Sequence, residues 1–186
     1  LTEDMLKDKG LKVDLDKFFE LEKEEFSFLD KRIFEKIFDP KNLEDFKYYQ
    51  DKLDTEDFSI VTIFDEDYPE NLKNIPDRPA LLYYKGKLEE NDKYSVAFVG
   101  ARRCTDYGKR ACQKLVSEVA EKGITTVSGL AYGIDSICHT TSLKAGKRTI
   151  GVIGCGIDVI YPKQNRRLYQ EMEEKGLILS EFPLET

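Results

Sequence analysis

The 186-residue sequence has no tryptophan, a single histidine and only four cysteines, none of them in a C-x-x-C pair. Because common zinc sites need several Cys or His ligands at short spacing, neither a zinc ribbon nor a multi-histidine metal centre is expected. A nucleophilic system that depends on histidine would have to use His139. We expect the cysteines to be reduced, as in a cytosolic protein, and to act as small apolar residues.

Long hydrophobic runs are also missing. No run approaches the roughly 20 apolar residues of a membrane span. The first residues include Glu3 and Asp4, so they do not resemble a secretory signal or transit peptide. We therefore expect a cytoplasmic protein without a membrane segment. A hydrophobic fraction of 40% is enough for one compact domain, alone or with a short appendage.

Charge is unevenly distributed along the chain. Residues 1–92 carry 15 basic and 26 acidic side chains, whereas residues 93–186 carry 14 basic and 10 acidic side chains. Six of the eight arginines lie in the second part. This asymmetry indicates an anionic ligand for the basic part, although an acidic solubilising segment joined to an ordinary domain would give the same pattern.

Residues 1–57 are strongly charged and read as a small N-terminal helical segment. A capping-box pattern at residues 27–30 leads into apolar residues at helical spacing, and Asp39-Pro40 ends that helix. A second helical pattern covers residues 42–53. Two short helices bury little apolar surface by themselves, so we expect them to pack on each other or on the domain that follows.

The region from residue 58 to residue 86 predicts one strand and a connector. Residues 58–64 are rich in β-branched and aromatic side chains and predict a strand. Three prolines follow, at positions 69, 76 and 79, and exclude long helices. We interpret residues 65–86 as an extended connector laid along the domain that follows.

From residue 94 onward, short apolar runs alternate with segments of helical length. The runs are residues 95–100, 125–129, 149–154 and 177–181, and the helical segments are about residues 107–122, 135–144 and 165–175. Runs that are apolar on both faces are typical of central strands in a parallel sheet. The sequence therefore predicts an α/β fold with a doubly wound, mostly parallel Rossmann-like sheet over residues 58–186.

Three glycine-bearing segments follow the predicted strands. They are G-A-R-R-C-T-D-Y-G at residues 100–108, S-G-L-A-Y-G-I-D at residues 128–135 and G-C-G-I-D at residues 154–158. In such a sheet, ligands bind at the carboxyl ends of the strands. Glycine permits close backbone approach and helix N-termini favour anions, so the pattern indicates a phosphate ligand. Ordinary turn geometry would also explain each glycine taken singly.

The phosphate is not expected to belong to a dinucleotide or to a P-loop substrate. The first segment lacks the second and third glycines of G-x-G-x-x-G, and no G-x-x-x-x-G-K-[ST] motif occurs. No cofactor is therefore predicted.

Residues 58–186 resemble the DNA-processing protein A family, also called DprA or Smf. Residues 99–102 are similar to the V-G-[SA]-R of that family, and residues 128–139 match S-G-L-A-x-G-I-D-x-x-x-H. Residues 149–165 match T-I-A-V-x-G-x-G-[LI]-D-x-x-Y-P-x-x-N, and residues 179–181 match its [IL]-S-E. These long motifs are specific.

The resemblance implies a binding function. Members of the family bind single-stranded DNA and deliver it to the RecA-type recombinase in natural transformation, usually as homodimers and without catalysis. The family continues beyond the position of Glu181 into an F-P-x-R-N-R-I-I motif, so we expect the C-terminal end of this domain to be missing here.

Six residues are predicted to contact DNA. Arg102 in the first segment can bind a phosphate through two hydrogen bonds, with a structural tie to Asp135 or Glu181 as the alternative. Lys163 follows a Tyr-Pro turn on the same edge, with a solvated lysine as its alternative. The others are Ser128, Gly129, Asn165 and Arg166. By contrast, Arg148 precedes a strand, so we expect it at the amino edge as a surface residue.

Three further residues receive mainly structural interpretations. Asp135 stands at the start of a helix and is expected to cap its free N–H groups. His139 lies four residues later and is expected to pair with Asp135, since no nucleophile accompanies it. Tyr132 could stack on a base or pack within its loop.

Two other functions compete with single-stranded DNA binding. A nucleotide-binding phosphoribohydrolase shares this fold type, but its P-G-G-x-G-T-x-x-E loop has no counterpart here. A scaffold acting through the acidic N-terminal helices is the second alternative. No catalytic residue is predicted.

Overall fold

The computed structural model describes residues 48, 51, 52, 55 and 57–186. The chain divides into two units, residues 1–57 and 58–186. The four described residues before Asp57 are helical. The predicted capping box and the helix end at Asp39-Pro40 lie outside the described residues. The second unit contains all the strands described below.

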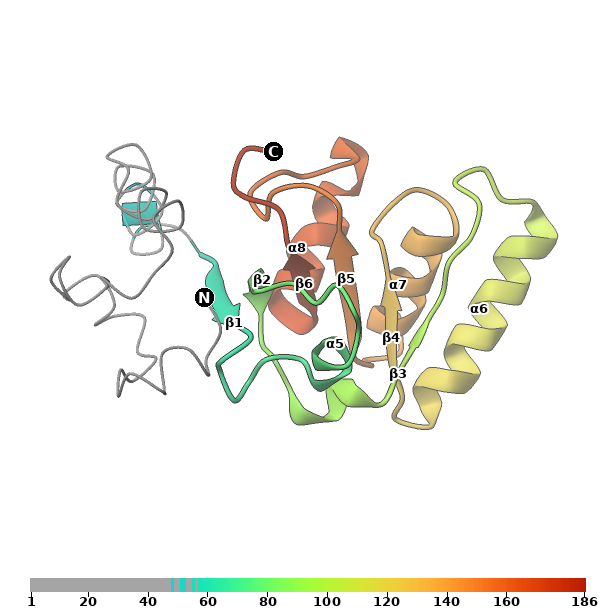
Figure 1. Cartoon of the computed structure of the whole chain (residues 1–186). Helices are drawn as coiled ribbons and strands as arrows, with labels where there is room; N and C mark the ends of the chain where they lie inside the picture. The colour runs from blue at the N-terminus through green and yellow to red at the C-terminus, as the bar shows by residue number, and fades with distance from the viewer. Residues whose placement is uncertain (1–47, 49–50, 53–54, 56) are drawn as a thin grey trace, which may run out of the picture. The chain divides into compact units, whose positions relative to one another are not determined.

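A six-stranded sheet forms the centre of the second unit (Figure 1). Its strands are β1 (Ser59–Thr62), β2 (Leu81–Gly86), β3 (Ser95–Ala97), β4 (Thr125–Ser128), β5 (Thr149–Ile153) and β6 (Leu177–Ser180). Their order across the sheet is β1-β2-β6-β5-β4-β3. The four strands from β3 to β6 are parallel to one another, and β1 and β2 are antiparallel to their neighbours. The predicted α/β class with a mostly parallel sheet is confirmed.

Three long helices connect the parallel strands. They are α6 (Asp106–Glu121), α7 (Ile134–Lys144) and α8 (Arg166–Lys175), close to the bounds that the sequence predicts. Each strand from β3 to β6 lies beside the next one along the chain, so right-handed crossovers place all three helices on one face. Helix α7 accordingly contacts both α6 and α8.

The opposite face of the sheet carries the segment between β1 and β3 instead of a second row of long helices. This segment contains α5 (Glu70–Lys73) and the 3-10 helix η2 (Glu90–Lys93). Tyr68 is buried against Val61 and Leu82, and its hydroxyl donates to the Pro79 carbonyl at 2.6 Å. Over residues 58–186, the two faces are therefore covered by different kinds of structure.

The interpretation of residues 81–86 as the end of a connector is wrong. They form β2, an internal strand that pairs with β1 on one side and β6 on the other. Leu82 and Tyr83 are buried there. The run L-L-Y-Y-K-G at residues 81–86 is rich in the apolar and aromatic residues that favour strands. The prolines that precede it favour an extended connector, and the two signals conflict in the sequence.

Helix α6 shows why the boundaries were predictable. The Thr105 hydroxyl accepts a hydrogen bond from the Gly108 amide at 3.1 Å and so caps the first turn. Gly123 has a φ of +76°, the left-handed conformation expected of a residue just after a helix. Cys112 and Val116 lie on the buried face of the helix and pack with Cys138 of α7. Local sequence and packing agree in this element.

The two faces of the parallel strands differ in polarity. Away from the helices, Ile150, Leu177 and Leu179 form an apolar cluster. Toward α7, Thr126 and Thr149 are fully buried, and the Thr126 hydroxyl lies 2.8 Å from the Ser142 hydroxyl of α7. Paired hydroxyls avoid the cost of burying unsatisfied polar groups. No helix among the described residues is long and apolar enough to cross a membrane.

Candidate functional site

Three loops follow the carboxyl ends of consecutive parallel strands. The first loop (residues 98–105) joins β3 to α6, and the second loop (residues 129–133) joins β4 to α7. The third loop (residues 154–165) joins β5 to α8 and includes the 3-10 helix η3 (Lys163–Asn165). We call these three loops together the loop cluster, and they lie along the upper edge of the sheet in Figure 1. Each loop ends at the N-terminus of a long helix.

The first and second loops are held together through Gly133. Its φ is +80°, and a Cβ there would overlap the carbonyl oxygen of Ala101 and lie 2.6 Å from that of Arg102. The Ile134 amide also donates to the Ala101 carbonyl at 3.4 Å. Glycine is therefore required because the backbone beside Arg102 approaches this position closely. The glycines in these two loops serve loop packing.

Asn165 holds the second and third loops together. Its Nδ2 group donates to the Leu130 carbonyl at 2.7 Å and lies 3.0 Å from the Ser136 hydroxyl. The Ser136 hydroxyl in turn donates to the Ala131 carbonyl at 2.5 Å. Because one amide side chain bonds the backbone of another loop, the second and third loops form a single unit. All three predicted phosphate loops are thus brought together.

The basic residues of the loop cluster are exposed and uncompensated. Arg102, Arg103 and Lys163 are exposed in these loops, and Arg166 is exposed directly after them as the first residue of α8. Within the part of the chain that the structure describes, none of these four side chains forms a hydrogen bond or an ion pair. The alternative that Arg102 ties the loops through Asp135 or Glu181 has no such bond to support it. Arg103 was not predicted, although it is adjacent to Arg102.

The other predicted DNA contacts are engaged inside the fold. Ser128 is buried and its hydroxyl donates to the Phe98 carbonyl at 2.6 Å. The Gly129 amide donates to Oδ2 of Asp135 at 3.2 Å. With Asn165, these residues fix the positions of the loops, whereas Arg102 and Lys163 project charge from them. The structure therefore separates positioning residues from available cations.

Two predicted interactions are wrong: Asp135 does not cap helix α7, and His139 does not pair with Asp135. Helix α7 has Gly133 at its N-cap and no side-chain cap, because the Asp135 carboxylate bonds the Gly129 amide instead. His139 Nδ1 lies 2.8 Å from the Thr149 hydroxyl and makes no pair with Asp135. Burial lowers the pKa of the fully buried His139 to about 4, and the nearby Ser128 backbone only partly opposes that shift. A neutral, buried imidazole has no access to a ligand.

The four cysteines are free thiols, as their spacing predicts. Burial raises the pKa of the Cys138 thiol to about 12, so it stays protonated and behaves as a small apolar residue. Among the described residues, no group of three or more His, Cys, Asp or Glu side chains could hold a metal ion.

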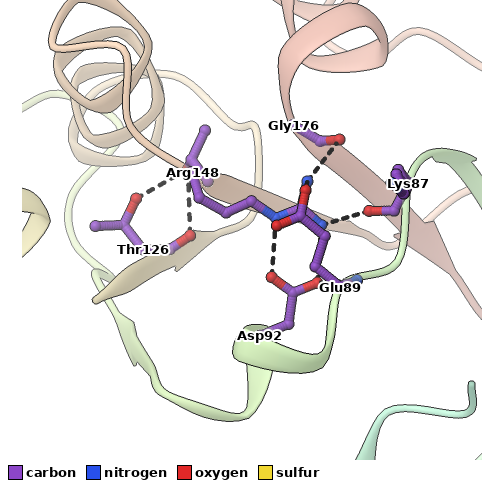
Figure 2. Close-up of polar contacts among 7 residues, drawn as sticks. Lys87, Glu89, Asp92, Thr126, Arg148 and Gly176 are labelled. Carbon is purple, nitrogen blue, oxygen red and sulfur yellow. Dashed lines mark hydrogen bonds and ion pairs between the residues drawn. The ribbon is translucent and has the colours of Figure 1, made fainter. Parts of the chain in front are cut away.

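Arg148 lies immediately before β5, at the amino edge of the sheet, but it is not the surface residue that the sequence predicts. Its side chain is 16% exposed and joins several segments (Figure 2). Nε and Nη2 donate to the two oxygens of Asp92 at 2.9 and 2.8 Å. The guanidinium also donates to the carbonyls of Lys87 and Gly176. These partners could not be inferred from the sequence, because they lie 28 to 61 positions away.

A cavity of about 290 Å³ lies elsewhere in the second unit, between the sheet and the segment before β3. It is lined by apolar residues of the sheet, such as Val127, Ile150 and Leu179, and by acidic residues such as Glu66 and Glu70. None of its lining residues belongs to the loop cluster. Since acidic groups repel phosphates, the cavity does not suit the predicted ligand, and the loop cluster remains the candidate site.

Comparison with known proteins identifies close relatives. Residues 59–186 match the family model described as DNA recombination-mediator protein A. Protein Smf of Synechocystis is 43% identical over 129 residues, covering 67% of this chain and 32% of that protein. DNA processing protein DprA of Streptococcus pneumoniae is 42% identical over 125 residues, covering 67% of this chain and 44% of that protein. The chain thus spans less than half the length of these relatives.

Solved structures that resemble this chain include two of DNA processing protein A. The crystal structure of DNA processing protein A from Streptococcus pneumoniae superposes with a TM-score of 0.74 at 31% identity, over 98% of this chain and 61% of that one. A structure of the Helicobacter pylori protein, reported for its single-stranded DNA binding mode, superposes with a TM-score of 0.59 at 33% identity. It covers 69% of this chain and 57% of that one.

Proposed function

Because the chain belongs to the DNA recombination-mediator protein A family, we propose that its loop cluster binds single-stranded DNA without strong sequence preference. The observation that carries the proposal is the pair of uncompensated cations, Arg102 and Lys163, on loops whose backbones are bonded to each other. Phosphate contacts of this kind supply most of the affinity in sequence-independent binding.

The loop cluster is suited to phosphate because its cations need no rearrangement. Arg102 extends from a backbone fixed against Gly133, and Lys163 lies two residues before Asn165, which bonds the second loop. Loops fixed in advance lose little conformational freedom on binding. Arg102 can bind one phosphate through two parallel hydrogen bonds, while Lys163 acts as a point charge. Arg166, the first residue of α8, adds a secondary contact.

Membership of the family supports a finer proposal for the function. We place the chain in the processing of incoming single-stranded DNA during natural transformation, in which the bound strand is passed to a RecA-type recombinase. We also propose that the protein acts as a homodimer and that its activity is binding without catalysis. The internal bonding of Asp135 and His139 supports the absence of acid–base chemistry at this site.

The test is a fluorescence-anisotropy titration of a labelled oligo-dT strand and of a duplex of equal length. We expect the chain to prefer the single strand and its affinity to fall linearly on a log–log plot against salt. Replacing both Arg102 and Lys163 with alanine should weaken binding by at least about 30-fold, since each charge-assisted contact contributes about 1–3 kcal/mol. Lys147→Ala, an exposed lysine at the amino edge, is the matched control and should bind normally.

Two results would contradict the proposal. One is equal binding of duplex and single strand, and the other is unchanged oligo-dT affinity in the double variant. Incubation with nucleoside monophosphates tests the alternative enzyme, since a phosphoribohydrolase would release free base. We expect no release.

A further inference from the structure

Two tyrosines of the loop cluster are exposed to solvent. Tyr132 in the second loop is 40% exposed and Tyr161 in the third loop is 62% exposed. Neither phenol forms a hydrogen bond within the described part of the chain. Exposed tyrosine rings on a surface that also carries free cations are suited to stacking on the bases of a nucleic acid.

Tyr132 stands on a backbone fixed on both sides. The Ala131 carbonyl before it accepts hydrogen bonds from the Ser136 amide and hydroxyl, at 3.1 and 2.5 Å. Gly133 after it packs against the Arg102 carbonyl. The ring therefore projects from a rigid loop tip, one residue from the contact with the backbone of Arg102. A side chain held in this way is already oriented before a ligand arrives.

Tyr161 has a comparable anchor. Its backbone carbonyl accepts a hydrogen bond from the hydroxyl of Tyr169 at 3.0 Å. Tyr169 is buried in α8, and burial raises its pKa to about 12, so its hydroxyl remains a donor over the whole physiological range. Tyr161 lies two residues before Lys163, and Asn165 connects this loop to the backbone beside Tyr132.

We propose that Tyr132 and Tyr161 stack on unpaired bases while Arg102 and Lys163 hold the adjoining phosphates. This inference rests on the proposed function and adds the recognition of bases to it. Every base has an aromatic face, so stacking binds all sequences, but a duplex hides those faces within its base stack. The tyrosines would then account for a preference for single strands, which cations alone do not provide.

The experiment compares oligo-dT with an abasic strand of the same length, which has the phosphates but no bases. The unmodified chain should bind oligo-dT about 5- to 100-fold more tightly than the abasic strand, the range for stacking on an aromatic side chain. Tyr132→Ala and Tyr161→Ala should each remove part of that difference, and their affinity for the abasic strand should not change. The salt dependence should stay the same, because no phosphate contact is lost.

Three variants make the result specific. Tyr132→Phe keeps the ring and should bind like the parent, whereas Tyr132→Leu keeps apolar bulk and should bind like Tyr132→Ala. Tyr94→Ala is the matched control, since Tyr94 is 63% exposed and immediately precedes β3 at the amino edge. Unfolding midpoints equal to that of the parent will show that each variant is folded.

The outcomes separate the two proposals. If the parent binds both strands equally, or if both tyrosine variants bind oligo-dT normally, stacking is wrong and phosphate binding stands. If Arg102→Ala weakens binding to both strands while the tyrosine variants weaken only oligo-dT, both proposals are supported. If the parent binds neither strand, the proposed function fails and the stacking proposal fails with it.

Discussion

Two arginines at opposite edges of one sheet have opposite environments. Arg148, at the amino edge, is 16% exposed and bonded to Asp92 and to two backbone carbonyls. Arg102, at the carboxyl edge, is exposed and has no bonded partner among the described residues. Arg148 immediately precedes β5, and Arg102 lies in the loop that follows β3. An arginine therefore supports the fold where distant segments supply carboxylates and carbonyls that bond it. Where they supply none, it remains available to a ligand.

The rest of each edge agrees with this division. At the amino edge, the carboxylates of Glu89 and Asp92 neutralise Arg148, leaving little net positive charge for an anion. At the carboxyl edge, the Asp135 carboxylate accepts a hydrogen bond from the Gly129 amide and forms no ion pair with a cation among the described residues. One edge therefore stabilises the second unit, and the other presents positive charge on loops bonded to one another. Four substitution experiments test this comparison.

The largest effect on stability is expected for Arg148→Ala. Removing one partner of a mostly buried ion pair leaves the Asp92 carboxylate without compensation, which should lower the free energy of unfolding by about 3–5 kcal/mol. Urea unfolding followed by circular dichroism measures this loss. Arg148→Lys should recover little, because lysine cannot form the paired bonds to Asp92.

The control for Arg148 is Arg167→Ala. Arg167 is 91% exposed and pairs with Glu171 one helical turn away, so its removal should change stability by less than about 0.5 kcal/mol. Equal losses for Arg148→Ala and Arg167→Ala would show that the amino-edge cluster is not a structural tie.

Gly133→Ala should have the next largest effect, and it connects stability to the site. Alanine is strained at a φ of +80°, and its Cβ would collide with the backbone of the first loop, so we expect a loss of about 1–3 kcal/mol. Binding to oligo-dT should also weaken, because the backbone beside Arg102 must move. Gly146→Ala is the control: its φ is +65°, but nothing lies near the added Cβ. Normal DNA binding by folded Gly133→Ala would contradict the coupling of the loops.

The third largest effect on stability is expected from protonation of the buried His139 at low pH. Its pKa is about 4 in the folded chain and about 6.5 when unfolded, so between these values the unfolded state binds more protons. Stability should therefore fall as the pH is lowered from 7 to 5, by about 2 kcal/mol from this residue. His139→Gln should be less stable at pH 7 but should lose less stability on acidification. Parallel pH profiles for parent and variant would show that His139 does not contribute.

The smallest effect on stability is expected for Arg102→Ala, which should change the free energy of unfolding by less than about 0.5 kcal/mol, as at other exposed sites. Its affinity for oligo-dT should nevertheless fall by about 1–3 kcal/mol, and the salt slope should flatten by about one unit. Arg102→Lys should restore only part of the affinity, since lysine binds phosphate as a single point charge. A variant that binds normally but unfolds more easily would make Arg102 a structural residue.

Much of the fold could be predicted because its information is local. The capping Thr105, the glycine at position 123 and the apolar spacing of α6 all act within a few residues of one another. The same holds for the apolar runs that became β4, β5 and β6. Residues 81–86 were misread because neighbouring prolines suggested a connector, whereas pairing with β1 and β6 made them a strand.

The position of the candidate site could be predicted from the sequence. Which of its residues hold the loops in place and which remain available to a ligand could not. Parallel strands necessarily bring their carboxyl ends to one edge, so the meeting of three glycine-bearing loops followed from the order of the elements. The sequence could not show that Ser128 and Asn165 would bond to other loops. It also could not show that the glycine at position 133 is required by the backbone beside Arg102.

By itself, then, the sequence determined the α/β class, most helix and strand boundaries and the edge at which the glycine-bearing loops meet, because periodicity, capping and chain direction are local properties. Only the tertiary structure decided which charges are compensated. Arg148 meets Asp92 across 56 positions, and His139 meets Thr149 rather than its neighbour Asp135 on the same helix. Such pairings depend on how distant segments pack, and the energy of a charged group depends on the partners that packing provides.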